Sequence, residues 1–589
     1  MAGLLASVDA VFAPVFEALQ PRANSGLRVS QHADLQVDGV LGLARALGRV
    51  PRELAEEVLA MARERGLDHI CDSAVVAPPG FINLTLSSDF LAGELKKMAG
   101  GPGTLGVTSA ARALTVVIDY AAPNAAKQMH VGHLRSTIIG DSLVRLLELV
   151  GHKVVRENHI GDWGAPFGML IEHLLDVGEE EALHERALGD LEQFYQSART
   201  AYDNDPAFAD RARARVVLLQ SGDPETLRLW DVLVRQSVSY FDASFRRLGT
   251  RLTRDDVVAE SHYNPLLPGV VRDLAAKGLL VESEGARCVF PPGYTNRGGD
   301  PLPLIIQNSV GGYTYAATDL AAVRDRVDRL RAELLLYVVG LPQADHLAMV
   351  FTTARLAGWL PDGTEAVHLG FGNVLGPDGK MFRTRQGGTV KLDELLDEAV
   401  ERARAVIEGR GDEEGKSQME ELSSEELEAV VRAVGIGAVK YADLSTDRTR
   451  DYRFDWERML SFDGNTGPYL QYAHARICSI FRRASDDAEP PDGLGAVGAV
   501  REHEERELAK KLLGFGDAVS STVATYSPHK LCAYLFELAS AFTGFYEHCP
   551  VLRAPDPETR ASRLALCALT AAVLEKGLDL LGIEAPTRM

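Results

Sequence analysis

Residues 114–137 read Leu-Thr-Val-Val-Ile-Asp-Tyr-Ala-Ala-Pro-Asn-Ala-Ala-Lys-Gln-Met-His-Val-Gly-His-Leu-Arg-Ser-Thr. The segment opens with a short β-branched run, 114–119, of the kind that forms a buried parallel strand. A helical pattern over 131–150 and a second apolar run at 153–156 follow. Strand, helix and strand in this order begin a βαβ unit. The sequence therefore predicts an α/β fold with a doubly wound, Rossmann-type parallel sheet.

The turn after this predicted strand suits a phosphate ligand. Ligands of such sheets lie at the carboxyl end of a strand, where helix N–H groups and the helix dipole favour anions. His130 and His133 are three residues apart and project to one face of the first helical turn. Gly132 lets a flat ring approach the backbone, and Lys127 adds a positive charge. A metal pair or two half-exposed polar side chains are the alternatives, but the strand, the Pro-Asn turn and the glycine favour phosphate.

The rest of the chain divides by pattern into further units. Within the first unit, helices are expected over 35–47 and 51–62 and strands over 74–77 and 81–86. Further strands are expected at 304–307, 313–316, 335–339 and 367–370. The predicted domains are a small α/β unit at 1–105, the sheet domain at 106–400 with a mainly helical insertion at about 177–300, a helical linker at 401–454 and a helical domain at 455–589.

Composition narrows the class of protein. The chain has 589 residues, of which 46% are hydrophobic and 25% charged, as in ordinary globular proteins. No apolar run reaches the ~18 residues of a membrane span, and no basic segment marks a signal peptide. Six dispersed cysteines without a CxxC pair argue against a zinc ribbon or disulfide framework and fit a reducing cytoplasm. The net charge of −21 counts against a nucleic-acid partner, although local basic patches can still bind RNA.

The His130-Val-Gly-His133 segment resembles the HIGH signature of class I aminoacyl-tRNA synthetases, and its block is similar to that of the arginyl-tRNA synthetases. The resemblance covers nearly the full chain. Matching blocks in the family's order are Glu157-Asn-His-Ile-Gly-Asp-Trp-Gly164, Ala316-Ala-Thr-Asp319, Gly379-Lys-Met-Phe-Arg-Thr-Arg-Gln-Gly-Gly388, the run from Asp463 to Arg476, and the end from Gly577 to Met589. The family's activity implies an ATP-dependent arginine–tRNA ligase with the partners L-arginine, ATP and tRNA(Arg).

For arginine, the resemblance implies a site for a planar cation with five donors. Tyr315 and Asp319, four residues apart, are expected to hold the side chain, with Asp119 as an accessory acid. By the same resemblance Asn124, His133 and Gln343 would hold the α-amino and carboxylate groups. Lysine and citrulline would leave buried acceptors unpaired, so discrimination without editing is feasible.

For ATP, the resemblance implies a second signature of the form KMSKS, which is degenerate here. The resemblance assigns ATP binding to Lys127, His130, Gly132, His133, Lys380, Arg383 and Arg385. It assigns catalysis to five of these residues: Lys127, His130, His133, Lys380 and Arg383. The usual second lysine is missing from the loop, and Lys127, just ahead of the HIGH block, occupies the place of the lysine that compensates in many relatives. Mg²⁺ is expected with ATP, and no dedicated metal cage is visible.

For RNA, the resemblance implies that 1–105 touches the tRNA elbow, 401–454 the stem and 455–589 the anticodon. The expected contacts are Gln36, Asp38, Arg476, Tyr526 and Met589, with Arg483 seven residues after Arg476 on one helix face. Relatives often have Asn where this chain has Asp38, which offers no donor and repels phosphate. Elbow recognition is therefore expected to be weakened or altered.

Two other functions remain open on the sequence alone. One is a paralogue that has lost aminoacylation and acts as an RNA-binding or regulatory module; the intact His130, His133, Asn124 and Asp319 argue against it. The other is a small nucleotidyltransferase with an HxGH motif, which the length and the helical tail disfavour. The family is typically monomeric, and its members generally need bound tRNA before they activate arginine, so both are expectations here.

Overall fold

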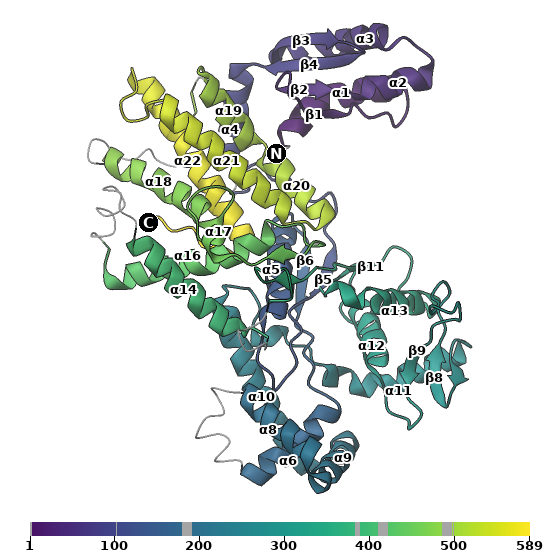
Figure 1. Cartoon of the computed structure of the whole chain (residues 1–589). Helices are drawn as coiled ribbons and strands as arrows, with labels where there is room; N and C mark the ends of the chain where they lie inside the picture. Colours follow the sequence, from purple (N-terminus) through teal and green to yellow (C-terminus); the bar gives the residue numbers. More distant parts are fainter. Residues whose placement is uncertain are drawn as a thin grey trace.

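The computed structural model describes residues 3–101, 103–178, 191–382, 389–409, 422–485, 497–498 and 500–589. Figure 1 shows a small N-terminal domain beside a C-terminal bundle of helices, with a parallel sheet at the centre and two lobes inserted into the sheet domain. In the described part of the chain, no helix is long and apolar enough to cross a membrane.

The N-terminal domain packs helices on one face of an antiparallel sheet with the order β1-β2-β4-β3. Its elements are α1 (Leu4–Leu19), β1 (Leu27–Val29), β2 (Leu35–Val37), α2 (Gly39–Leu47), α3 (Pro51–Glu64), η1 (Leu67–His69), β3 (Cys71–Ala77), β4 (Phe81–Leu86) and α4 (Ser88–Gly100). The helix predicted over 35–47 is wrong in its first part. Leu35 and Val37 alternate with Gln36 and pair with β4, and α2 begins only at Gly39.

The central sheet is parallel and has the order β11-β10-β5-β6, which confirms the doubly wound fold. Its strands are β5 (Thr115–Asp119), β6 (Lys153–Glu157), β10 (Leu334–Tyr337) and β11 (Glu365–His368), and α5 (Val131–Leu149) connects the first two. The chain adds β6 on one side of β5 and later returns to add β10 on the other. Such a reversal of strand order opens a crevice at the carboxyl ends of β5 and β10, where ligands of these folds bind.

The insertions form the two lobes seen in Figure 1. The first consists of α6 (Ala165–Val177), α8 (Leu191–Asn204), α9 (Pro206–Ser221) and α10 (Pro224–Arg247). The second contains η2 (Arg254–Asp256), η3 (Glu260–Leu266), α11 (Leu267–Ala276), β7 (Val281–Ser283), β8 (Ala286–Val289), β9 (Leu304–Gln307), α12 (Tyr315–Asp328), η4 (Leu341–Gln343) and α13 (Ala344–Leu356). The strand predicted over 313–316 is wrong, because Thr314 already hydrogen-bonds β9 through its hydroxyl group and α12 starts at Tyr315.

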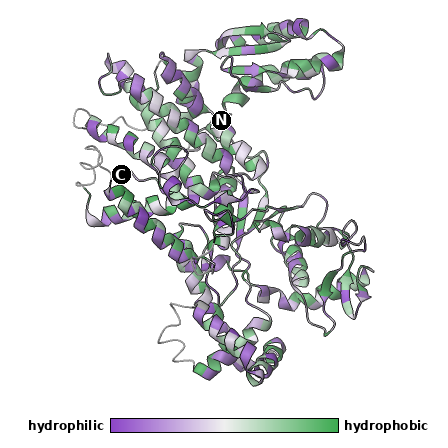
Figure 2. Ribbon diagram, in the orientation of Figure 1, coloured by the Kyte–Doolittle hydropathy of each residue, from purple (hydrophilic) through white to green (hydrophobic). Residues whose placement is uncertain are grey.

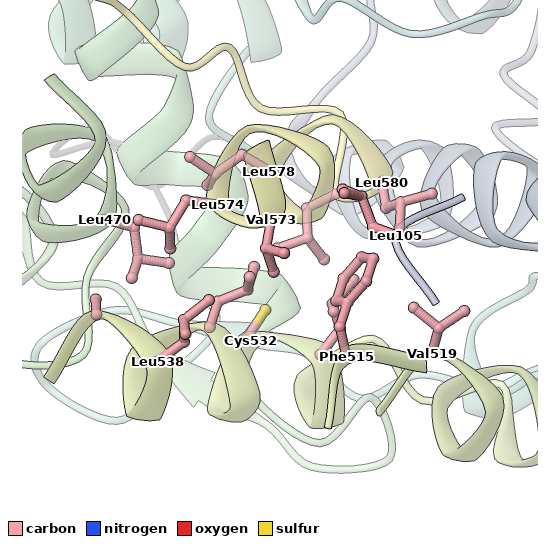
Figure 3. Close-up of a cluster of buried hydrophobic side chains, with 14 of the residues drawn as sticks. Leu105, Leu470, Phe515, Val519, Cys532, Leu538, Val573, Leu574, Leu578 and Leu580 are labelled. Atoms are coloured by element: carbon pink, nitrogen blue, oxygen red, sulfur yellow. The ribbon is translucent and has the colours of Figure 1, made fainter. Parts of the chain in front are cut away.

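After β11, the described part of the chain is helical apart from one small pair of strands. Its elements are β12 (Val374–Leu375), α14 (Leu392–Glu408), α16 (Ser424–Leu444), β13 (Tyr452–Arg453), α17 (Trp456–Met459), α18 (Gly467–Ser485), α19 (His503–Leu513), α20 (Phe515–Thr525), α21 (His529–His548) and α22 (Pro557–Leu580). Hydrophobic and hydrophilic residues alternate along these helices in Figure 2, as expected for amphipathic helices of a bundle. The apolar faces of α18, α20, α21 and α22 meet in one core, in which Phe515, Cys532 and Val573 are fully buried (Figure 3).

Helix α5 joins the sheet to this bundle. Its side chains from Leu134 to Leu147 are nearly all buried, because the sheet covers one side and α16, α20 and α22 cover others. Polar ties cross the same boundary: Arg135 forms a buried ion pair of 3.0 Å with Asp443 of α16, and the Ser142 hydroxyl group donates to the Leu580 carbonyl oxygen. The helix that starts at the predicted phosphate site is therefore held rigidly by both halves of the protein.

Candidate active site

The segment between β5 and α5 lies at the crevice and has an unusual backbone. Ala121, Ala122 and Ala126 all have positive φ angles, 72°, 45° and 58°, which L-residues rarely adopt. Such backbone strain persists only where the surroundings hold it, and it gathers at functional sites. Here the Ala121 N–H donates to the Ser136 hydroxyl group at 2.9 Å. That hydroxyl group in turn donates to the carbonyl oxygen of Val338, the residue that follows β10, at 2.6 Å. The loop is thus fixed across the two strands that flank the crevice.

The two histidines cap the N-terminus of α5 reciprocally. The Gly132 N–H donates to Nδ1 of His130 at 3.0 Å, and the His130 N–H donates to Nδ1 of His133 at 3.1 Å. Because each Nδ1 accepts a hydrogen bond, the hydrogen of each neutral ring lies on Nε2. The two ring centroids are 4.0 Å apart. Burial lowers the pKa of His133 to about 3, and the nearby His130 acts in the same direction. His133 is therefore neutral near pH 7, and both rings offer Nε2–H donors beside a helix N-terminus.

Gly132 has a second role that the sequence did not reveal. A Cβ atom at this position would lie 2.8 Å from Cε1 of His130, closer than real contacts allow. The glycine therefore lets the His130 ring fold over the first turn of α5, and it is itself exposed. Its predicted contact with a nucleotide ring remains a prediction.

The loop that resembles KMSKS begins and ends next to this helix terminus. It leaves β12, which pairs with β13, and an antiparallel bridge joins Leu375 to Met381. At its far end the Val131 N–H donates to the Val390 carbonyl oxygen at 3.0 Å. Lys380 is exposed in the described part of the loop, whereas Arg383 and Arg385 lie outside the described residues. Lys127 lies 4.4 Å from the centre of the Tyr195 ring of the helical insertion.

Tyr315 and Asp319 lie on one face of α12, as their spacing predicted. Nε2 of His346, on α13, lies 2.6 Å from Oδ2 of Asp319. The Tyr315 and His346 rings are 4.6 Å apart, and the Tyr315 side chain is 66% exposed. A phenol, a carboxylate and an imidazole thus form one cluster. The sequence analysis missed His346, although it follows Gln343 by only three residues; Gln343 itself is exposed at the end of η4.

Asp119 lies deeper than its predicted role required. Its Oδ2 accepts a hydrogen bond of 2.7 Å from Arg326, whose Nε donates to Glu157 at 2.6 Å. Arg326 is 1% exposed, so two carboxylates surround one buried guanidinium group and leave a net negative charge. Oδ1 of Asp119 is buried and has no hydrogen-bond partner among the described residues. One oxygen of Asp119 is therefore committed to Arg326 and the other is open to a donor.

Glu260, another residue that the sequence analysis missed, completes an acidic environment. Burial raises its pKa to about 7; Asp162 and Asp319 raise it as well, whereas His159 lowers it. Glu260 and Tyr315 both line a cavity of about 370 Å³ between the two lobes, with Trp163 and Thr318. A carboxylate held back from ionisation by burial, and further by other carboxylates, favours a cationic ligand, which would stabilise its charged form. An isolated acid among apolar neighbours was the only signal in the sequence.

A larger cavity, of about 650 Å³, lies elsewhere, between α10, α16 and α22. Several of its arginines are paired: Arg145 pairs with Asp141 and Asp579, and Arg247 pairs with Asp393. No group of three or more potential metal ligands occurs among the described residues.

Asn124 and the N-terminal candidates occupy defined positions. Asn124 is exposed and forms a parallel bridge with Gly161. A Cβ atom at position 161 would lie 2.3 Å from Oδ1 of Asn124, so the glycine makes room for the Asn124 side chain. Gln36 is buried, with its amide donating to Asn83 at 2.6 Å and accepting from Arg28 at 2.7 Å. Arg28 also pairs with Asp38. The charge of Asp38, expected to repel phosphate, is therefore balanced by a cation on the neighbouring strand.

The C-terminal candidates are not gathered in one place. Arg476 lies over the ring of Tyr546, 4.5 Å from its centre, and Met589 is buried in the bundle core. Tyr526 instead ends α20 at the boundary with the catalytic sheet, where burial and then Glu365 of β11 raise its pKa. The sequence analysis missed Tyr546. The RNA contacts predicted for Arg476, Tyr526 and Met589 remain predictions.

Comparisons with known proteins agree with this arrangement. Three families match in order along the chain: "Arginyl tRNA synthetase N terminal domain" over residues 10–86, "tRNA synthetases class I (R), catalytic domain" over 103–456 and "DALR anticodon binding domain" over 470–589. An arginine–tRNA ligase of Thermobifida fusca is 51% identical over 583 residues, 99% of this chain and 98% of the relative. One of Klebsiella pneumoniae is 49% identical over 97% of this chain and 96% of its own.

Solved structures give the same result. The arginyl-tRNA synthetase of Plasmodium falciparum superposes with a TM-score of 0.82 at 27% identity, and that of Thermus thermophilus with 0.80 at 26%, each over the full length of both chains. The family models and the full-length relatives together extend over the doubly wound sheet, the histidine cap and the helical bundle. The chain belongs to the arginyl-tRNA synthetase family of class I aminoacyl-tRNA synthetases.

Proposed function

We propose that the protein ligates L-arginine to the 3′ end of tRNA(Arg) in two steps. An arginine carboxylate oxygen attacks the α-phosphorus of ATP, and the bond to the leaving pyrophosphate breaks. A ribose hydroxyl group of the tRNA then attacks the carbonyl carbon of the arginyl-adenylate, and AMP leaves as the hydroxyl group loses its proton. No protein nucleophile takes part, so the chain contributes position and charge stabilisation. The observation that carries the proposal is the Tyr315–Asp319–His346 cluster in the fold that carries the histidine cap.

On the phosphate side, the capped helix terminus supplies the donors. Nε2–H groups of His130 and His133 and the N-terminal amides of α5 would stabilise charge that develops on the phosphoryl oxygens. Lys127, Lys380, Arg383 and Arg385 would neutralise the β- and γ-phosphates. The backbone bond between Val131 and Val390 supports this, because it anchors the end of the loop at the helix terminus.

The phosphate subsite also indicates how Mg²⁺ takes part. Its candidate side chains are imidazoles, ammonium groups and guanidinium groups, whereas Mg²⁺ prefers oxygen ligands. These residues fit phosphate oxygens and not the metal ion. We therefore propose that Mg²⁺ enters as part of the MgATP substrate.

On the amino-acid side, a guanidinium group would bind Asp319 and Tyr315, with Asn124, His133 and Gln343 at the α-amino and carboxylate groups. Two further observations support this assignment. Oδ1 of Asp119 is a buried acceptor to which no described residue donates, and Glu260 lines the cavity beside Tyr315 as an acid whose pKa is raised by burial and by neighbouring acids. A neutral or smaller side chain would leave these acceptors unpaired, which rejects citrulline and lysine.

The RNA roles follow from the matched domains. We propose that the N-terminal domain contacts the tRNA elbow through the region of Gln36 and Asp38, and that the C-terminal bundle binds the anticodon. The segment 401–454 would contact the stem. Arg28 beside Asp38 supports RNA contact there, because its guanidinium group compensates the acid that the sequence places at this surface.

The cellular compartment and the oligomeric state are also proposals. We infer that the protein works in the cytoplasm as a monomer. All six cysteines are free thiols, and five of them are buried, which suits a reducing compartment.

ATP–pyrophosphate exchange and aminoacylation with purified tRNA test the proposal. Arginine-dependent exchange that requires tRNA, followed by charging of tRNA(Arg), is the expected result. If the protein bound tRNA but catalysed neither reaction under any condition, the regulatory paralogue would be correct. Exchange with another amino acid or acid substrate would identify a different adenylating enzyme.

A further inference from the structure

Arg448 connects the C-terminal bundle directly to the catalytic sheet. It lies in the short segment 445–451 between α16 and β13. Its Nε donates to the Tyr526 carbonyl oxygen at 3.2 Å, and its Nη1 donates to the Gly370 carbonyl oxygen at 2.7 Å. Tyr526 belongs to the bundle and Gly370 follows β11, so one guanidinium group spans the boundary between the two domains.

On the bundle side, Arg448 contacts a residue with an unusual backbone conformation. Tyr526 ends α20 in the left-handed conformation, with φ 50° and ψ 45°, which is costly for a residue with a side chain. Phe515 and Val519 of the same helix are buried in the bundle core (Figure 3). Because that core packs α18, α20, α21 and α22 together, a displacement of the bundle moves the Tyr526 carbonyl group with it.

On the catalytic side, the contact reaches both predicted substrate subsites. The residue after Gly370 is Phe371, whose carbonyl oxygen accepts from the Leu341 N–H at 3.0 Å at the start of η4, and η4 ends at Gln343. The Gly372 N–H donates to the Arg448 carbonyl oxygen at 2.9 Å. The chain then continues into β12 and the loop that carries Lys380. Arg448 therefore holds the segment between the amino-acid subsite and the ATP loop from two directions.

The chemistry of this bridge differs from that of the other ties between the domains. The ion pair of Arg135 with Asp443 is fully buried and joins two opposite charges, which makes it costly to disturb. Arg448 forms no ion pair within the described part of the chain and donates only to carbonyl groups. Burial lowers its pKa, and only Asp447 opposes this. Breaking either of its two hydrogen bonds leaves a neutral carbonyl group and no unpaired carboxylate.

We propose that Arg448 is a positioning residue through which RNA bound to the C-terminal bundle sets the geometry of the arginine and ATP subsites. The inference rests on the proposed function, because it concerns the rate of that reaction. Correct binding of the anticodon fixes the bundle, the Tyr526 carbonyl group fixes Arg448, and Arg448 fixes the Gly370–Gly372 segment. Coupling between sites that lie in different domains commonly changes a reaction or an affinity by about 5- to 150-fold.

The test compares two tRNA(Arg) transcripts, one intact and one with its anticodon bases replaced, in aminoacylation by the full-length protein. With the unchanged protein, replacing the anticodon lowers kcat and raises KM for tRNA. In Arg448→Met, which keeps the length but removes all donors, kcat with intact tRNA falls by about tenfold. The kcat of Arg448→Met with the anticodon-replaced transcript changes by less than about twofold. Its KM for intact tRNA also changes by less than about twofold, because RNA binding itself does not use Arg448.

Two variants separate this coupling from a general structural effect. Arg448→Lys keeps the charge but cannot reach two carbonyl groups at once, so it restores only part of the kcat with intact tRNA. Arg450→Met, at an exposed arginine two residues further on, behaves like the unchanged protein, because only its backbone carbonyl group contacts Arg135. Thermal unfolding of each variant is measured in parallel.

Three results would overturn the proposal: equal losses of kcat with both transcripts in Arg448→Met, full activity of Arg448→Met with both, or an unchanged protein whose kcat does not respond to the anticodon. Failure of the proposed function looks different, since the unchanged protein would then not charge tRNA with arginine at all.

Discussion

Oδ2 of Asp319 and Nε2 of His346 lie 2.6 Å apart, across the gap between α12 and α13. The two residues are 27 positions apart in sequence, and the packing of α12 on α13 brings them together. The hydrogen bond fixes the carboxylate beside Tyr315 with one oxygen occupied, so the second oxygen and the phenol define the direction from which a guanidinium group can approach. Under the proposed function, arginine binding should therefore depend strongly on the charge of Asp319.

Asp319→Asn should therefore weaken arginine use selectively. The amide keeps the shape but loses the charge, and truncating one partner of a buried charge pair costs ~2 kcal/mol or more, about 30-fold in kcat/KM for arginine. KM for ATP and affinity for tRNA should stay near those of the unchanged protein. Steady-state kinetics with each substrate varied in turn measure the effect.

Asp328→Asn is the matched control, because Asp328 lies on the same helix but is exposed and pairs only with Arg324. An unchanged kcat/KM for arginine in Asp319→Asn, or an equal loss in both variants, would show that the guanidinium group binds elsewhere.

Glu260 should make arginine binding depend on pH. Its pKa of about 7 means that its charge develops between about pH 6 and pH 8. A bound guanidinium group favours the ionised form, so KM for arginine should fall as pH rises through this range, by up to about tenfold. His133, with a pKa near 3, stays neutral throughout and does not contribute to this change. In Glu260→Gln the dependence should vanish, with KM equal to that of the unchanged protein near pH 6 and higher near pH 8.

The same group affects stability in the opposite sense. The folded-state pKa of Glu260 lies above its unfolded value, so its contribution to stability is complete below the unfolded pKa of 4.5 and is lost as pH rises through about 7. Relative to the unchanged protein without ligand, Glu260→Gln should gain stability with rising pH. Thermal unfolding at several pH values measures this, with exposed Glu282→Gln as the control. A stability difference that does not depend on pH would contradict the environment assigned to Glu260.

How far the sequence predicts this site depends on how local each feature is. The strand and helix around residues 114–150 were predictable because β-branched residues and a helical period follow each other without interruption. Tyr315 and Asp319 also share a face as their spacing predicted. In contrast, 313–316 and 35–37 were misread, because short apolar runs have no period long enough to separate strand from helix.

The features that could not be predicted all join distant segments. His346 meets Asp319 only after α12 and α13 pack, and the pKa of Glu260 is raised by its burial and by acids on other segments. Arg326 is one of many charged residues on a helix by sequence, and only the parallel pairing of β5 with β6 brings Asp119 and Glu157 to it together. Burial and long-range pairing, which no local pattern encodes, decide these roles.

His130 should show separable effects on stability and catalysis. Its Nδ1 caps α5, and its Nε2–H is the proposed donor to phosphate. Asn can replace the capping acceptor but not the second donor, so His130→Asn should lower kcat by about 100-fold or more while stability stays nearly unchanged. His130→Ala loses both groups and should in addition lose ~1 kcal/mol of stability. ATP–pyrophosphate exchange kinetics and urea unfolding of His130→Asn and His130→Ala measure the two effects. Equal stability of the two variants would refute the capping role.

Arg326 should be essential for stability because it is the shared counter-ion of two buried carboxylates. Removing one partner of a buried ion pair typically costs ~3–5 kcal/mol, since the remaining charges have no compensation. Arg326→Met should therefore shift urea unfolding, followed by tryptophan fluorescence, to much lower denaturant. Arg329→Met removes an arginine from the same region whose side chain is half exposed and pairs with a single carboxylate, Asp325, and should therefore cost less than Arg326→Met. Adding Asp119→Asn and Glu157→Gln to Arg326→Met removes the uncompensated charges and should restore much of the loss. If the triple variant were less stable than Arg326→Met alone, the cost would arise from lost packing around the guanidinium group and not from the buried acids.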